Sequence, residues 1–509
     1  MAEQHELLQG RLGRRTFLKG AALAGLASAS PALWMQSARA TGSPRVSRHL
    51  AFGADPQREA VVSFACAEPF RSAQIEYGPD DTYGVTVPAD VRSVPGVSTR
   101  YGHGRIQGLS PDTRYRYRIR LDGVVTGAGT LTTAPSRPEP FTFTAFGDEG
   151  VSTRAQSVIQ AMGQVAPRFH LLAGDICYAD SSGHGSLKDH FDPSVWDAWL
   201  TMIEPVAATT PWMCATGNHD MEPGYGALGY SGYLDRFVVP GNGAQGCPST
   251  YSFRYGNVGF LCLDSNDVSY EIPHNLGYSH GLQTMWADQQ LAAYRSPGSG
   301  VDFVVVYFHH CAFSTSSQHG SEGGVRDAWV PLFDKHEVDL VINGHAHLYE
   351  RTSPLRGGHI TADAGRFGRV DSSKGTTYIT AGGGGAPLHG RFLTGGRSFV
   401  FGPDQTQESE ATPWALPTKT TRHTFLAVDV TPADGGNAPT MRIRGIDWHG
   451  RLVDEVTLAR RGDAAHGVDP LWVVGGGLAL GGGALGTARW YHRRATAQDG
   501  PEAEVQRPL

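Results

Sequence analysis

The sequence FTFTAFGDEG at residues 141–150 joins an apolar run to a cluster of glycine and acidic residues. The same pattern returns as FHLLAGDICY at residues 169–178, and FVVVYFHH at residues 303–310 joins a similar apolar run to two histidines. Each apolar run has the length of a buried β-strand, and stretches with a helical pattern lie between the runs. Strands that alternate with helices predict an α/β domain, which we expect over residues 141–460.

The other elements of this domain follow from the same patterns. Strands are expected at residues 141–146, 169–173, 212–215, 260–263, 303–308, 340–342 and 378–380. Helices are expected at residues 154–165, 195–206, 282–294 and 326–336. Residues 424–430 and 441–458 are expected to form terminal strands that extend the domain.

Five of these strands are followed directly by polar clusters. The clusters are GDEG at residues 147–150, GDICY at 174–178, TGNHD at 216–220, HH at 309–310 and NGHAH at 343–347. Loops at the carboxyl ends of α/β strands converge on one edge of the sheet, where binding sites form. Each cluster alone is a weak signal, because Gly-Asp turns are common. The ordered set of five predicts that these polar side chains lie together.

The residue types in these clusters indicate a metal centre. Carboxylate, phenolate, amide oxygen and imidazole, without thiolate, suit Fe, Mn or Zn. The clusters hold more ligands than one ion needs, which implies two ions that share a bridging carboxylate. Paired metals about 3.5–4 Å apart clamp the attacking and leaving oxygens of a phosphoryl displacement. The sequence therefore predicts a phosphoesterase with a two-metal active site.

The motifs G-D-x-G, G-D-x-x-Y, G-N-H-D, V-x-x-H and G-H-x-H occur in this order and resemble those of the purple acid phosphatases, within the metallophosphoesterase superfamily. The resemblance covers about residues 141 to 385. It implies a four-layer αββα fold, in which two β-sheets are flanked by helices. It also implies a binuclear centre of Fe(III) and a divalent Zn, Fe or Mn ion.

The same resemblance implies a role for each motif residue. The ferric ion would be held by Asp148, Tyr178 and His347. The divalent ion would be held by Asn218, His309 and His345. Asp175 would bridge the two ions. His309 is preferred to His310, because the first histidine after the strand is the ligand in the family.

Two further histidines are implied to act on the substrate. His219 would contact the phosphate and protonate the leaving group, and His319 matches a substrate histidine of the family in its spacing from His309. The chain departs from the family at Cys311, where members often have proline, and at Gln318, where some have a second histidine. A loop histidine without a catalytic role is the alternative interpretation of His319.

The implied reaction is hydrolysis of a phosphomonoester by attack of metal hydroxide on phosphorus, the acid phosphatase type of reaction. A phosphodiesterase or nucleotidase on the same scaffold is one alternative. Common members of that kind have D-x-H at the first motif, whereas this chain has Gly150 there and Tyr178 to take the vacated position. A cell-surface binding protein with an inactive enzyme domain is the other alternative. That alternative predicts lost ligands, and no motif residue is missing.

Residues 46–134 predict a separate β-sandwich, because short alternating strands there are broken by Gly, Pro and Asp. The segment LSPDTRYRY at residues 109–117 resembles the approach to strand F of fibronectin type III domains, in which Tyr115 would be the tyrosine-corner residue. Plant-type purple acid phosphatases carry such an N-terminal domain. A proline-rich linker at residues 134–140 separates the two domains.

Both ends of the chain carry membrane-related patterns. Residues 1–40 have the order of a twin-arginine signal peptide, with paired arginines, a small-residue apolar stretch and the cleavage site Ala38-Arg39-Ala40. Residues 471–488 form an uncharged run followed by arginines, which predicts a C-terminal transmembrane anchor. The glycines of this run leave a flexible tail as the alternative. We expect export by the twin-arginine route and an extracytoplasmic protein anchored to the cell membrane.

The composition narrows the class of partner. The 509-residue chain is 40% hydrophobic and 18% charged, which is globular rather than disordered composition. A formal charge of −6 provides no basic face for nucleic acid, so nucleic acid is not an expected partner. The motifs and the resemblance imply a phosphate ester substrate instead. The six cysteines include no C-x-x-C pair, and both disulfides and buried free thiols are compatible with their spacing.

Overall fold

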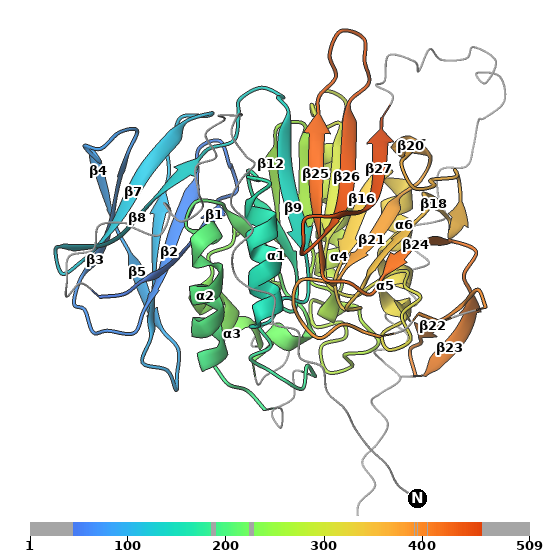
Figure 1. Ribbon diagram of the computed structural model, residues 1–509, viewed down its shortest axis with the longest axis horizontal. Coiled ribbons are helices and arrows are strands. Elements are labelled where there is room, and N and C mark those ends of the chain that lie inside the picture. Colours follow the sequence, from blue (N-terminus) through green and yellow to red (C-terminus); the bar gives the residue numbers. More distant parts are fainter. Residues whose placement is uncertain are drawn as a thin grey trace, which may run out of the picture.

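The computed structural model describes residues 44–184, 190–222, 229–390, 392–393, 395–404 and 406–460. These residues form a β-sandwich and a larger α/β unit that lie side by side (Figure 1). The expected signal peptide and C-terminal anchor lie outside the described residues. Within the described ranges, no helix is long and apolar enough to span a bilayer.

The sandwich is built from eight strands. They are β1 Ser47–Phe52, β2 Ala60–Cys66, β3 Ala73–Gly78, β4 Val85–Pro88, β5 Asp90–Ser93, β6 Arg100–Ile106, β7 Arg114–Leu121 and β8 Val124–Thr132. One sheet has the order β1-β2-β6-β5 and the other β4-β3-β7-β8. Alternate residues of β7, including Tyr115 and Tyr117, are buried in the sandwich core. The Tyr115 hydroxyl accepts a hydrogen bond from the backbone N–H of Ser110 at 2.9 Å, which confirms the predicted tyrosine corner.

The α/β unit contains two seven-stranded sheets. The first consists of β9 Phe141–Phe146, β10 His170–Ala173, β11 Trp212–Ala215, β20 Gly368–Asp371, β25 Thr424–Thr431, β26 Thr440–Asp447 and β27 Leu452–Ala459. The second consists of β12 Tyr251–Tyr255, β13 Val258–Cys262, β14 Phe303–Tyr307, β16 Leu340–Asn343, β17 Tyr349–Thr352, β21 Thr377–Ala381 and β24 Ala415–Thr420. Their orders are β11-β10-β9-β25-β26-β27-β20 and β12-β13-β14-β16-β21-β17-β24. The predicted terminal strands therefore complete the first sheet beside β9.

Smaller elements surround these sheets. The helices are α1 Thr153–Gly163, α2 Ser194–Ala207, α3 Ser231–Arg236, α4 Leu282–Tyr294, α5 Gly323–Ala328 and α6 Val330–Lys335. Short 3₁₀ turns are η2 Asn218–Asp220, η4 Ser265–Asp267 and η5 Ser372–Lys374. Two small sheets are formed by β15 Ser321–Glu322 with β22 Arg397–Phe401 and β23 Gln407–Ala411, and by β18 Leu355–Arg356 with β19 His359–Ile360.

The layers of the α/β unit follow the order αββα. Alternate strand residues such as Phe143 and Val305 fill the core between the two sheets. Trp199 of α2 packs in a second core on the outer face of the first sheet, and Leu291 of α4 packs in a third core on the second sheet. The central strands are thus buried on both faces, which explains their continuous apolar sequence. The predicted fold class is confirmed.

The prediction of a single helix at residues 326–336 is wrong in one respect. The structure has two short helices there, α5 and α6, separated at Trp329. Pro331 is the cause, because it has no N–H to donate to the carbonyl of Asp327 and its ring would clash with that carbonyl. With the break between the helices, Val325 of α5 and Phe333 of α6 both pack in the same apolar core.

The sandwich is fixed to the helix layer of the α/β unit. Arg48 on β1 forms an ion pair with Glu204 on α2, with 2.5 Å between Nη2 and Oε1. The Tyr117 hydroxyl donates to the backbone carbonyl of Ala208 at the end of α2, at 2.7 Å. The sandwich therefore braces the helix that covers the first sheet.

All six cysteines lie among the described residues, and each is a buried free thiol. Burial raises the pKa of Cys66 to about 11 and that of Cys311 to about 12. Since the thiolate is the reactive form, these side chains act as small apolar groups of the core.

Candidate metal centre

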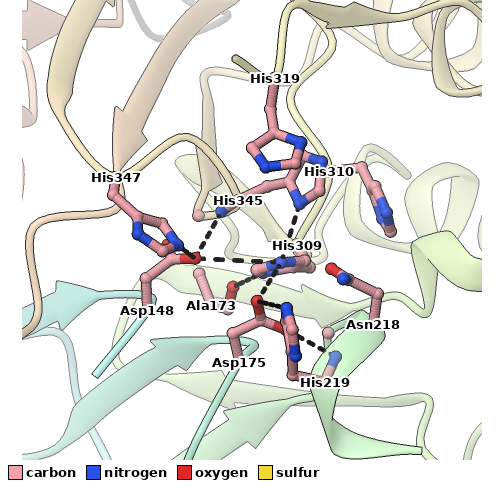
Figure 2. Close-up of polar contacts among 12 residues, drawn as sticks. Asp148, Ala173, Asp175, Asn218, His219, His309, His310, His319, His345 and His347 are labelled. Atoms are coloured by element: carbon pink, nitrogen blue, oxygen red, sulfur yellow. Dashed lines mark hydrogen bonds and ion pairs between the residues drawn. The ribbon is translucent and has the colours of Figure 1, made fainter. Parts of the chain in front are cut away.

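The carboxyl ends of strands from both stacked sheets meet at one edge. Figure 2 shows side chains that follow these strands, among them Asp148, Asp175, Asn218, His309 and His345, lying close together. Parallel strands β9, β10 and β11 end at Asp148, Asp175 and Asn218 of the first sheet. Strands β14 and β16, also parallel, end at His309 and His345 of the second. The structure thus brings together the side chains that the sequence motifs singled out.

The first group of side chains surrounds one point. The Tyr178 hydroxyl lies 2.9 Å from His347 Nε2 and 3.3 Å from Asp148 Oδ1. His347 Nε2 lies 3.2 Å from the same Asp148 oxygen. His347 Nδ1–H donates to the carbonyl of Pro387 at 2.7 Å, so the other ring nitrogen, Nε2, is free to bind a metal. Asp148, Asp175 and His347 can offer three ligand atoms within 4.8 Å of one another.

The second group lies on the other side of Asp175. His309 Nε2 is 3.1 Å from Asp175 Oδ2 and 3.3 Å from His345 Nδ1. His309 Nδ1–H donates to the carbonyl of Ala173 at 2.9 Å, which leaves Nε2 as the atom available to a metal. The Asn218 amide group donates to the carbonyl of Gly183 at 3.1 Å, so its oxygen is the atom available to a metal.

These residues fit a pair of cations. In the part of the chain that the structure describes, Asp148 Oδ2 and Asn218 Oδ1 are buried oxygens without a hydrogen-bond partner. Burial, and then the negative charges of Asp148 and Asp175, raise the pKa of the Tyr178 phenol well above its usual range. A bound cation has the opposite effect, because it stabilises the phenolate and the buried carboxylates. The donor set of oxygen and imidazole nitrogen suits Fe, Mn or Zn.

The backbone of the site is strained at several of these residues. Asp148, Asp175, Tyr178 and His345 have φ angles of 59°, 51°, 61° and 67°, in the left-handed region. Such non-glycine conformations each cost about 1–3 kcal/mol and cluster at functional sites. Close packing of the site also explains why the motifs contain glycine. A Cβ at Gly217 would lie 2.2 Å from Asp175 Oδ1.

Comparisons with known proteins agree with this geometry. Residues 141–349 match the calcineurin-like phosphoesterase family, and residues 46–144 match the N-terminal domain of purple acid phosphatases. An uncharacterized protein of Mycobacterium tuberculosis is 33% identical over 474 residues, which cover 83% of this chain and 88% of the relative. Purple acid phosphatase 23 of Arabidopsis thaliana is 27% identical over 306 residues, 56% of this chain and 62% of the relative.

The chain belongs to the purple acid phosphatase family. The structure of a purple acid phosphatase from yellow lupin seeds has the same fold, with a TM-score of 0.64 at 20% identity over 82% of this chain and 75% of that one. Membership of this phosphatase family and the two ligand groups imply a binuclear metal centre. The recognition made from the motifs is confirmed.

Two more histidines face the centre of this purple acid phosphatase family member. His219 Nδ1–H donates to the carbonyl of Asp180 at 2.6 Å, and its Nε2 lies 4.0 Å from Asp175 Oδ2. The ring of His319 lies 4.2 Å from that of His345 (Figure 2). Both side chains therefore lie next to the proposed ligands.

Asp220, the last residue of the G-N-H-D motif, ties two loops of the site together. Its carboxylate accepts hydrogen bonds from the backbone N–H groups of Ile176 and Gly217, at 2.8 and 2.7 Å. Burial, and then the charge of Asp175, raise the pKa of Asp220 to about 8. Its role is to hold the loops that carry Asp175 and Asn218.

Sequence reasoning missed two residues of the site. Glu271 hydrogen-bonds His345 and His319, and the His389 ring stacks on that of His347 with 4.0 Å between centroids. The polar cluster at residues 264–267 follows strand β13 as the other clusters follow theirs, but Glu271 lies four residues beyond it, so the end of the strand does not mark this glutamate.

Proposed function

We propose that the protein is a binuclear phosphatase that hydrolyses phosphomonoesters. The observation that carries the proposal is the pairing of Gly150 with Tyr178. A Cβ at Gly150 would lie 3.3 Å from Tyr178 Cδ2, so the tyrosine ring fills the space beside the glycine. Its hydroxyl then reaches the point shared by Asp148 and His347. This arrangement supports a tyrosinate ligand where a D-x-H enzyme would use histidine.

The proposed assignment of ligands follows the two groups. Asp148, Tyr178 and His347 would hold Fe(III). Asn218, His309 and His345 would hold a divalent Zn, Fe or Mn ion, and Asp175 would contribute to both sites. When bound, the two metal ions would act as Lewis acids toward the phosphate and would activate water for attack on phosphorus.

The protein's own residues orient the substrate and move the proton. His219 has its Nδ1 proton held by the Asp180 carbonyl, so Nε2 faces the centre and can give a proton to the departing alkoxide. His319 lies on the other side, next to His345, and binds the phosphate or the leaving-group oxygen. Together they give the alcohol a route to leave without a full negative charge.

A comparison of substrate classes tests this function. Protein purified without chelators is expected to hydrolyse an aryl phosphate monoester with higher kcat/KM than the matching diester. A preparation of Asp175→Asn serves as the control for contaminating phosphatases. Higher kcat/KM for the diester would instead favour the phosphodiesterase alternative.

We also propose that the enzyme is exported by the twin-arginine route and retained at the membrane by residues 471–488, on the sequence patterns at both ends. Phosphatase activity is expected in the membrane fraction of cells, facing outward. A chain truncated after Gly467 is expected to be released as soluble, active enzyme. Full-length protein that fractionates as freely soluble would contradict the anchor. Replacing Arg14 and Arg15 by lysine is expected to block export. If the variant's activity is still found at the membrane, facing outward, the twin-arginine route is contradicted.

A further inference from the structure

Glu271 lies between a proposed metal ligand and a proposed substrate residue. Its Oε2 is 2.7 Å from His345 Nε2, and its Oε1 is 3.1 Å from His319 Nδ1. The side chain is 21% exposed, and the loop that carries it follows η4, far from both histidines in sequence. At these distances each oxygen of the Glu271 carboxylate accepts from an N–H of one ring.

These two contacts fix the tautomer of both histidines. With the proton of His345 on Nε2, its Nδ1 lone pair lies 3.3 Å from His309 Nε2, on the side where the divalent ion is proposed. With the proton of His319 on Nδ1, its Nε2 is the nitrogen that can meet substrate. The other two ligand histidines are held by backbone carbonyls, those of Ala173 and Pro387. Of the three proposed ligand histidines, His345 is the one whose second ring nitrogen is held by a side chain.

A third metal ion is the competing explanation of this cluster. Glu271, His310 and His345 can offer three ligand atoms within 4.8 Å of one another, and among the described residues His310 Nε2 has no hydrogen-bond partner. However, a neutral imidazole has one ring proton and one ring lone pair. With Nδ1 of His345 assigned to the divalent ion, its Nε2 carries the proton and donates to Glu271 Oε2 at 2.7 Å, so Nε2 is not available to a third ion.

We propose that Glu271 is a positioning residue that couples the divalent-ion ligand His345 to the substrate histidine His319 through one carboxylate. This inference rests on the proposed function of the site. Outer carboxylates of this kind orient ligand imidazoles and raise their basicity, and their loss typically costs 10–100-fold in metal affinity or activity. Here the same group also orients the residue that meets the substrate, so metal binding and substrate positioning depend on one side chain.

Glu271→Gln tests the coupling, because glutamine keeps the shape but has only one acceptor oxygen for the two N–H donors. We expect the affinity for the divalent ion to fall about 10–100-fold. At saturating metal, kcat is expected to fall by a similar factor, with a smaller change in KM and a steeper dependence on the leaving-group pKa. Glu408→Gln, on exposed β23, is the matched control and should match the wild type.

Glu271→Gln in a His319→Ala background separates the effect on the metal ligand His345 from the effect on the substrate residue His319. At saturating metal, Glu271→Gln is expected to change kcat of that variant by less than about twofold, because its effect passes through His319. An undiminished loss of kcat, an unchanged metal affinity, or the loss of a third metal equivalent would each overturn the proposal. Wild-type protein inactive on every phosphomonoester would refute the proposed function instead, and the metal titration would still test the contact with His345.

Discussion

Asp175→Asn is expected to lower phosphatase activity by about 10⁴-fold or more. Asp175 is the residue shared by the two ligand groups, with Oδ2 3.1 Å from His309 Nε2. Each ion contributes several kcal/mol of charge stabilisation to the transition state, and each 1.36 kcal/mol is a factor of ten in rate. An amide can neither bridge two cations with negative charge nor balance their repulsion. We therefore expect the variant to bind fewer than two metal ions per chain.

The fold of Asp175→Asn is expected to survive, because the amide has the shape of the carboxylate and removes a buried charge. Its Oδ1 can still accept from the His219 backbone N–H, a contact of 3.0 Å in the structure. Thermal unfolding and metal analysis are measured together with activity. Asp81→Asn, an exposed carboxylate of the sandwich, is the matched control. Full activity with two bound metals in the Asp175 variant would exclude the bridging role.

His219→Ala is expected to lower kcat by about 10²–10⁴-fold while both metals stay bound. The reason is that His219 lies beside the centre without being needed for coordination, and its Nε2 is the proton donor proposed for the leaving group. The loss should be greatest for alkyl phosphates, whose leaving groups need the proton. It should shrink for aryl phosphates with acidic leaving groups.

Metal content and kcat across a series of leaving groups test this prediction. His359→Ala, on the exposed hairpin of β18 and β19, is the matched control. Unchanged kcat toward alkyl phosphates would remove His219 from the mechanism. Loss of metal in the His219 variant would assign it to coordination instead.

The fold was largely predictable because the strands that position the site are buried on both faces. Phe303 to Tyr307 is a continuous apolar run for that reason, and its end marks the position of His309. The break between α5 and α6 was missed, although Pro331 signals it locally. The sandwich was predictable because the tyrosine corner is a local motif with one defining hydrogen bond to Ser110.

Only those site residues that directly follow the end of a strand could be predicted from the sequence. Asp148, Asn218 and the others do so, and the sheet order brings them together without further information. Glu271 and His389 are placed by the course of long loops, and Glu271 meets His345 across 74 residues of sequence. Only the three-dimensional path of these loops reveals the two contacts.

The most direct test of the account is metal quantitation with a visible absorption spectrum, on protein purified without chelators. We expect two metal ions per chain, one of them iron, and a pink to purple colour from charge transfer between tyrosinate and Fe(III). Tyr178→Phe should abolish the band and weaken iron retention, whereas Tyr83→Phe in the sandwich should leave both unchanged. Iron-loaded protein without a visible band, or a band that survives Tyr178→Phe, would contradict the tyrosinate centre.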